Sequence, residues 1–129
     1  MVGYNKRAVD QYASNNLQTS SPEQIAMLLL SAGQRCLYNI VLCIKTKQPL
    51  IQGANVNKAL DIITALIDLL NPAPSQLTAN LLTIYKQWID EIHTASMNND
   101  VISLERISKQ MGEFKDAWEI AQENRLKNN

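Results

Sequence analysis

The 129-residue sequence has few of the residues that build catalytic and metal sites, with one histidine, His93, and two cysteines. Cys36 and Cys43 are about 10 Å apart along one expected helix, whereas a disulfide needs Cα atoms within roughly 7 Å. Both are therefore expected to be reduced thiols of the core. Glu91 and His93 are two residues apart, which excludes the Glu-x-x-His spacing of di-metal sites in helical bundles.

The sequence also has no glycine-rich phosphate loop, no nucleophile elbow and no Cys-His pair with an orienting group. The carboxylates Asp61, Asp68, Asp90 and Glu91 have the spacing of a solvated helix face, and no pair is singled out for acid-base catalysis. His93 is expected on the surface. We therefore predict a protein that is not an enzyme, with no catalytic residue, no metal site and no cofactor.

The sequence has no excess of positive or negative charge, because twelve basic residues balance twelve acidic ones. No dense basic run is present that would follow a phosphate backbone, so nucleic acid is not an expected partner. The first twenty residues lack an apolar stretch of signal-peptide length, and no later segment is expected to span a membrane. The sequence thus predicts a soluble, cytoplasmic protein.

Glycine and proline number four each, and the four prolines fall where helix boundaries belong. The apolar spacing between them is helical, and no strand pattern is present. Short connections favour antiparallel neighbours, so we predict an all-α, antiparallel up-down four-helix bundle over 19–126. A separate arm over 1–18 precedes it, residues 48–53 form a connection, and the polar tail 124–129 frays. The helices are expected at about 22–47, 55–71, 75–97 and 100–123.

The first long helix has the clearest start signal and more apolar surface than one core stripe needs. Ser21 is suited to the N-cap, Pro22 to the first helical position, and Gln24 completes a capping box. Downstream, a second apolar set lies beside the ordinary core stripe. The set has two interpretations, since such a helix is either buried from several sides or leaves part of its surface as a docking groove.

The next two helices also have more apolar residues than a single core stripe needs. The arm adds Val9 and Tyr12, whose spacing of three places them on one helical edge. Ordinary packing against the end of the bundle also accounts for this pair. The candidate groove residues are Leu30, Leu37, Val41, Ile44, Ile62, Leu66, Leu69, Leu82 and Ile89.

Several segments of the chain resemble the flagellar secretion chaperone family FliS. The most specific ones are Val9-Asp10-Gln11-Tyr12, the run from Leu17 to Ile25, and Met27-Leu28. The resemblance implies a four-helix bundle that binds the disordered C-terminal segment of flagellin, prevents its premature polymerisation and assists type III export. It also implies that Val9 and Tyr12 belong to a lid over the client site, and that the export machinery is a second partner.

Two other functions are compatible with the same residues. One is a structural helical-bundle module that self-associates through its surplus apolar faces. The other is a divergent member of the family with a different export client. For the flagellin chaperone, the expected state is a monomer or a weak homodimer.

Overall fold

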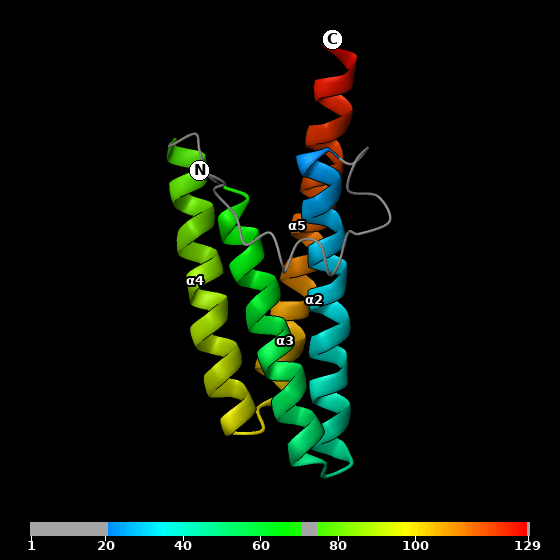
Figure 1. Ribbon diagram of the computed structural model, residues 1–129, viewed down its shortest axis with the longest axis vertical. Helices are drawn as coiled ribbons and strands as arrows, with labels where there is room; N and C mark the ends of the chain where they lie inside the picture. The colour runs from blue at the N-terminus through cyan, green and yellow to red at the C-terminus, as the bar shows by residue number, and fades with distance from the viewer. Residues whose placement is uncertain (1–20, 71–74, 129) are drawn as a thin grey trace.

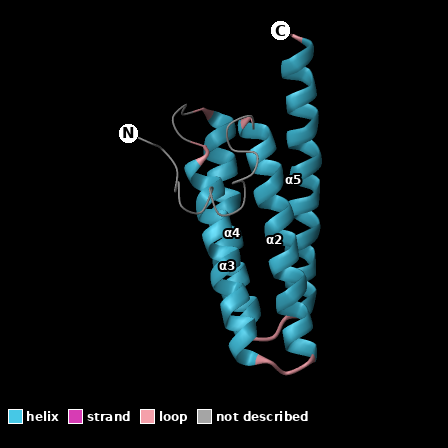
Figure 2. Ribbon diagram, turned by 45° about the vertical axis from the view of Figure 1, so that its right-hand side comes forward, coloured by secondary structure: helices cyan, strands magenta, loops and turns pink. Residues whose placement is uncertain are grey.

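The computed structural model describes residues 21–70 and 75–128, which form four helices: α2 (Pro22–Lys45), α3 (Pro49–Asp68), α4 (Gln76–Met97) and α5 (Val101–Lys127) (Figure 1). Within this part of the chain every regular element is a helix (Figure 2). Successive helices run in opposite directions along one long axis (Figure 1). The all-α helical bundle predicted from the sequence is confirmed.

The start of α2 has the predicted capping box. The Ser21 hydroxyl accepts a hydrogen bond from the Gln24 backbone N–H at 3.1 Å, and the Gln24 side chain accepts one from the Ser21 N–H at 3.0 Å. Ser75 caps α4 in the same way with Thr78, and Asp100 caps α5 by accepting from the Ser103 N–H. These caps satisfy backbone donors that a helix start leaves without partners.

Two tight turns connect the helices at one end of the bundle. Lys47 and Asn99 have positive φ angles of 56° and 52°, and each follows the last turn of a helix. The next backbone N–H in each turn, that of Gln48 or Asp100, donates back to Cys43 or Ala95. This is the Schellman arrangement, which ends a helix and lets the next one begin within a few residues.

The structure corrects two of the expected helix boundaries. Residues 48–53 were expected to connect helices, but α3 begins at Pro49, because the turn is complete by Gln48 and proline suits a first helical position. The tail over 124–129 was expected to fray from residue 124, but α5 continues to Lys127. Its last turns contact the start of α2 through Arg125.

Helix α2 is the centre of the packing. It packs extensively against both α3 and α5, whereas α4 packs less extensively against α3 and α5. An aromatic cluster of Tyr85, Trp88 and Phe114 joins α4 to α5, with ring centroids 5.1 to 6.2 Å apart. The Trp88 indole also donates to the Gln110 side chain at 2.9 Å. The looser fit of α4 leaves room between α4 and α5.

No segment after the first twenty residues was expected to span a membrane, and α2 is the helix that bears on this expectation. By length and composition it is apolar enough to cross a bilayer. In the bundle, half of its most apolar stretch is buried between neighbouring helices. A core helix passes the same test of length and composition, which accounts for the apolar character of α2.

The ion pair between Glu23 and Arg125 joins the first turn of α2 to the last turns of α5. The guanidinium donates to both carboxylate oxygens, at 3.0 and 3.1 Å. Burial raises the pKa of Glu23, but hydrogen bonds from Arg125, the backbone and Ser21 outweigh it, so the pKa lies below its ordinary value of 4.5.

A lowered pKa means that the folded state favours the charged carboxylate. The stabilisation is therefore fully present above pH 4.5 and is lost as the pH falls through the lower folded-state value. We expect Glu23→Gln to lower the free energy of unfolding by up to about 1 kcal/mol at neutral pH. Urea unfolding of both proteins from about pH 7 to about pH 3 measures this difference, which should shrink on acidification. A difference that is independent of pH would contradict it.

Candidate functional site

Five of the nine candidate groove residues are core residues. Each is at most 7% exposed, so the expectation that they form open groove surface is corrected. The physical reason is that α2 has a neighbour on each side, so α3 and α5 bury both of its apolar faces. Leu37 and Val41 still line a shallow hollow between α2 and α5. The five residues are Leu30, Leu37, Val41, Ile62 and Leu66.

The other four candidates, Ile44, Leu69, Leu82 and Ile89, are half-buried. Ile44, Leu69 and Ile89 pack against the edge of the core. Their positions are spread over α2, the end of α3 and α4, and they do not line the hollow between α4 and α5, the one between α2 and α5, or the one at the end of α4. Whether they contact a client stays a prediction. The lid residues Val9 and Tyr12 lie outside the described residues.

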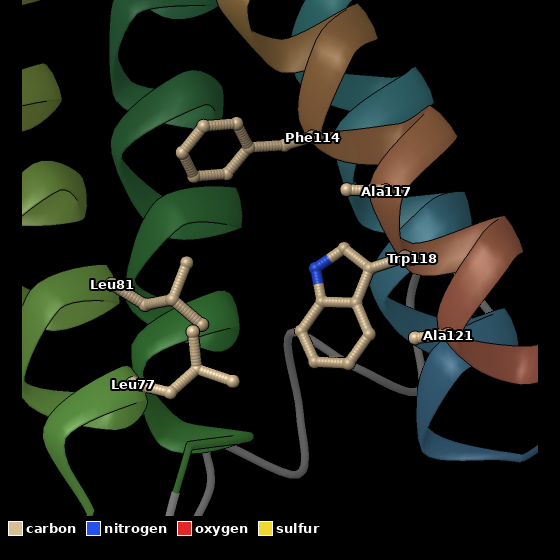
Figure 3. A pocket seen from close by; sticks show the side chains of 6 residues that line it. All are labelled: Leu77, Leu81, Phe114, Ala117, Trp118 and Ala121. Carbon is tan, nitrogen blue, oxygen red and sulfur yellow. The ribbon is translucent and has the colours of Figure 1, made fainter. Parts of the chain in front are cut away.

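An almost wholly apolar hollow of about 180 Å³ lies between α4 and α5. Figure 3 shows that Trp118 and Phe114 extend from α5 toward α4, whose Leu77 and Leu81 point back toward the indole. We call this hollow the α4/α5 cleft. Its lining residues are Leu77, Leu81, Phe114, Ala117, Trp118 and Ala121.

Helical spacing places these side chains in the α4/α5 cleft. Leu77 and Leu81 are one turn apart on α4, and the Ser75 cap fixes the start of that helix two residues before Leu77. On α5, Phe114 and Trp118 are also one turn apart, and the alanines beside Trp118 are too small to fill the space. Leu77 is 66% exposed, so the cleft opens to solvent beside it.

Tyr85 lies at the inner end of the α4/α5 cleft, one turn beyond Leu81 on α4. It is fully buried, and its ring contacts those of Phe114 and Trp88. Burial raises the pKa of Tyr85 to about 12, although the nearby Trp118 indole acts in the opposite direction. The phenol is therefore protonated, and hence a hydrogen-bond donor, at any physiological pH.

This cleft was not predicted from the sequence, because the helical spacing of its residues also fits ordinary core stripes. Leu77, Leu81, Phe114 and Trp118 do follow core spacing. What exposes them is the loose packing of α4 and the length of α5. Helical spacing offered no separate signal for the cleft, because it does not record how closely two helices pack.

The remaining groups considered in the described ranges are the cysteines, the histidine and the carboxylates. No three His, Cys, Asp or Glu side chains among them are grouped so as to hold a metal ion. Cys36 and Cys43 are free and buried, as predicted, and burial raises the pKa of the Cys36 thiol. His93 is exposed, also as predicted. A polar hollow lined by Asp90, Asp100 and their neighbours lies at the other end of α4.

Comparison with known proteins gives one family. The family model described as "Flagellar protein FliS" matches residues 4–125. The flagellar secretion chaperone FliS of Escherichia coli (strain K12) is 24% identical over 104 residues, covering 79% of this chain and 76% of the relative. The protein of the same name from Vibrio cholerae serotype O1 is 26% identical over 120 residues, covering 92% and 85%. This chain belongs to the FliS family.

Proposed function

We propose that this protein is a cytoplasmic export chaperone that binds the disordered C-terminal segment of flagellin, prevents its premature polymerisation and assists flagellar type III export. The relatives in Escherichia coli and Vibrio cholerae are named flagellar secretion chaperones, which gives the class of function. The observation that carries the proposal for this chain is the open, almost wholly apolar α4/α5 cleft. No catalytic step is part of the proposal.

The mechanism is coupled folding and binding. A disordered segment loses conformational entropy when it orders on a surface, so apolar burial must outweigh that cost. The α4/α5 cleft offers two aromatic rings and two leucines on well-formed helices, which lose little freedom on binding. Half-buried Leu82 and Ile89, further along α4, would extend the contact in the same direction.

The lid is the second part of the proposal. By family resemblance, Val9 and Tyr12 cover the client site until flagellin displaces them. The chain enters α2 at Ser21, whose hydroxyl accepts a hydrogen bond from Gln122 at 3.4 Å. Gln122 is one turn beyond Trp118 on α5, so the arm joins the bundle beside the cleft it would cover.

Calorimetric titration with the C-terminal segment of flagellin from the same organism tests both parts. One-to-one binding with a negative heat-capacity change is the expected result, because apolar surface is buried. Tyr12→Ser in the full chain should then tighten binding, since a weaker lid competes less with the client. Binding that is unchanged by Tyr12→Ser would contradict the lid, and no binding by either protein would contradict the chaperone function.

One observation favours the self-associating module as a second candidate. Leu50, Met97 and Ile102 are 72 to 90% exposed, and all lie near the turns at the end opposite the α4/α5 cleft. Mass measured against concentration separates the two functions. A stable dimer that does not bind flagellin would favour the module, whereas a monomer or weak dimer that binds flagellin would favour the chaperone.

A further inference from the structure

In the aromatic cluster, the Tyr85 hydroxyl differs from the Trp88 indole because its proton has no hydrogen-bond acceptor among the described residues. It is buried, and although the Trp118 indole N–H approaches the phenol oxygen as a donor, within the described part of the chain the hydroxyl proton has no acceptor. Its neighbour Trp88 donates its indole N–H to Gln110 at 2.9 Å. Buried tyrosine hydroxyls usually find a partner, because an unpaired buried donor has lost its hydrogen bonds to water.

The hydroxyl is close to the α4/α5 cleft. The Tyr85 ring contacts that of Phe114, with centroids 6.2 Å apart, and the Trp118 indole lies near enough to affect the phenol pKa. Both neighbours line the cleft (Figure 3). Trp118 is only half-buried, and movement of its indole is the step that would open the hydroxyl to a bound segment.

We propose that the Tyr85 hydroxyl is the polar anchor of the α4/α5 cleft and donates a hydrogen bond to a main-chain carbonyl oxygen of the bound flagellin segment. This inference rests on the proposed function. Apart from the indole N–H of Trp118, the six lining side chains are apolar, so their contacts supply affinity without fixing the position of the segment. A single buried donor fixes the register, because only one carbonyl can occupy that position.

The chemistry of the hydroxyl selects the acceptor. Because burial raises the pKa of Tyr85 to about 12, the phenol keeps its proton and acts as a donor. An apolar client segment has few side-chain acceptors, so its main chain must supply the oxygen. The last four carbonyl groups of a helix have no hydrogen-bond partner within that helix. A client segment whose short helix ends at the inner end of the cleft would therefore offer a free carbonyl oxygen to the hydroxyl.

Tyr85→Phe in the full-length protein tests the inference, because it removes the hydroxyl and keeps the ring. We expect the affinity for the flagellin segment, measured by calorimetry, to fall about 2- to 10-fold, the value of one hydrogen bond. The urea unfolding midpoint of the free protein should hardly change, since the hydroxyl proton has no acceptor in the described part of the chain. Tyr38→Phe, on exposed Tyr38 of α2, is the matched control and should change neither quantity.

Three results would overturn the anchor. Unchanged affinity in Tyr85→Phe, with the unaltered protein binding normally, would show that the hydroxyl does not contact the client. A fall in affinity together with a lower unfolding midpoint would show that it has a partner within the protein instead. If the unaltered protein does not bind the segment at all, the proposed function fails first and the anchor fails with it.

Discussion

Truncation of Leu37 to alanine is expected to lower the free energy of unfolding by about 2 to 5 kcal/mol. Leu37 is 1% exposed and belongs to the core that α2 forms with its two neighbours. The loss combines the transfer free energy of the removed methyl groups with that of the cavity they leave. Urea unfolding of both proteins, followed by circular dichroism, measures the difference.

Leu50→Ala is the matched control, because it makes the same chemical change at a side chain that is 90% exposed. Its effect should stay within about 0.5 kcal/mol. The pair also decides between the two interpretations of the second face of α2. If Leu37→Ala were as mild as Leu50→Ala and instead weakened binding of flagellin, Leu37 would be a groove residue after all.

The local features of the fold were predictable from the sequence because their causes are local. The Ser21, Pro22 and Gln24 start of α2 is a side-chain arrangement within one turn, and the structure has it as expected. The start of α3 was not predictable in the same way. Lys47 takes the left-handed conformation that glycine usually marks, so no glycine indicated the end of the turn, and Pro49 alone indicated where α3 begins.

The candidate site was harder to predict because periodicity does not say what covers a stripe. Leu30 on α2 and Phe114 on α5 both follow helical spacing. Leu30 is fully buried because α2 has extensive contacts on both sides, whereas Phe114 lies beside the more loosely packed α4. That difference depends on distances between helices, which no local pattern contains.

Replacement of Leu77 by aspartate is expected to weaken flagellin binding by about 100-fold or more. Leu77 lines the open side of the α4/α5 cleft, so a bound apolar segment would cover the new carboxylate. Removing a charge from water without a partner is costly, and the lining of the cleft offers no cation. A 100-fold loss corresponds to about 2.7 kcal/mol, well within that cost.

The same substitution should leave the free protein as stable as before. Leu77 is 66% exposed, so little buried area is lost. It is also the second residue of α4, and a negative charge in the first turn interacts favourably with the helix dipole. Leu77→Asp therefore separates client binding from folding, which truncation of a core residue cannot do.

Gln76→Asp provides the control for charge, because it adds a carboxylate one residue earlier and does not line the cleft. Its binding should be close to that of the unaltered protein. Equal losses in both variants would mean that charge at the start of α4 repels the client at long range. Normal binding by Leu77→Asp would place the client on another face, and the hollow between α2 and α5 that includes Leu37 and Val41 would then be the next surface to test.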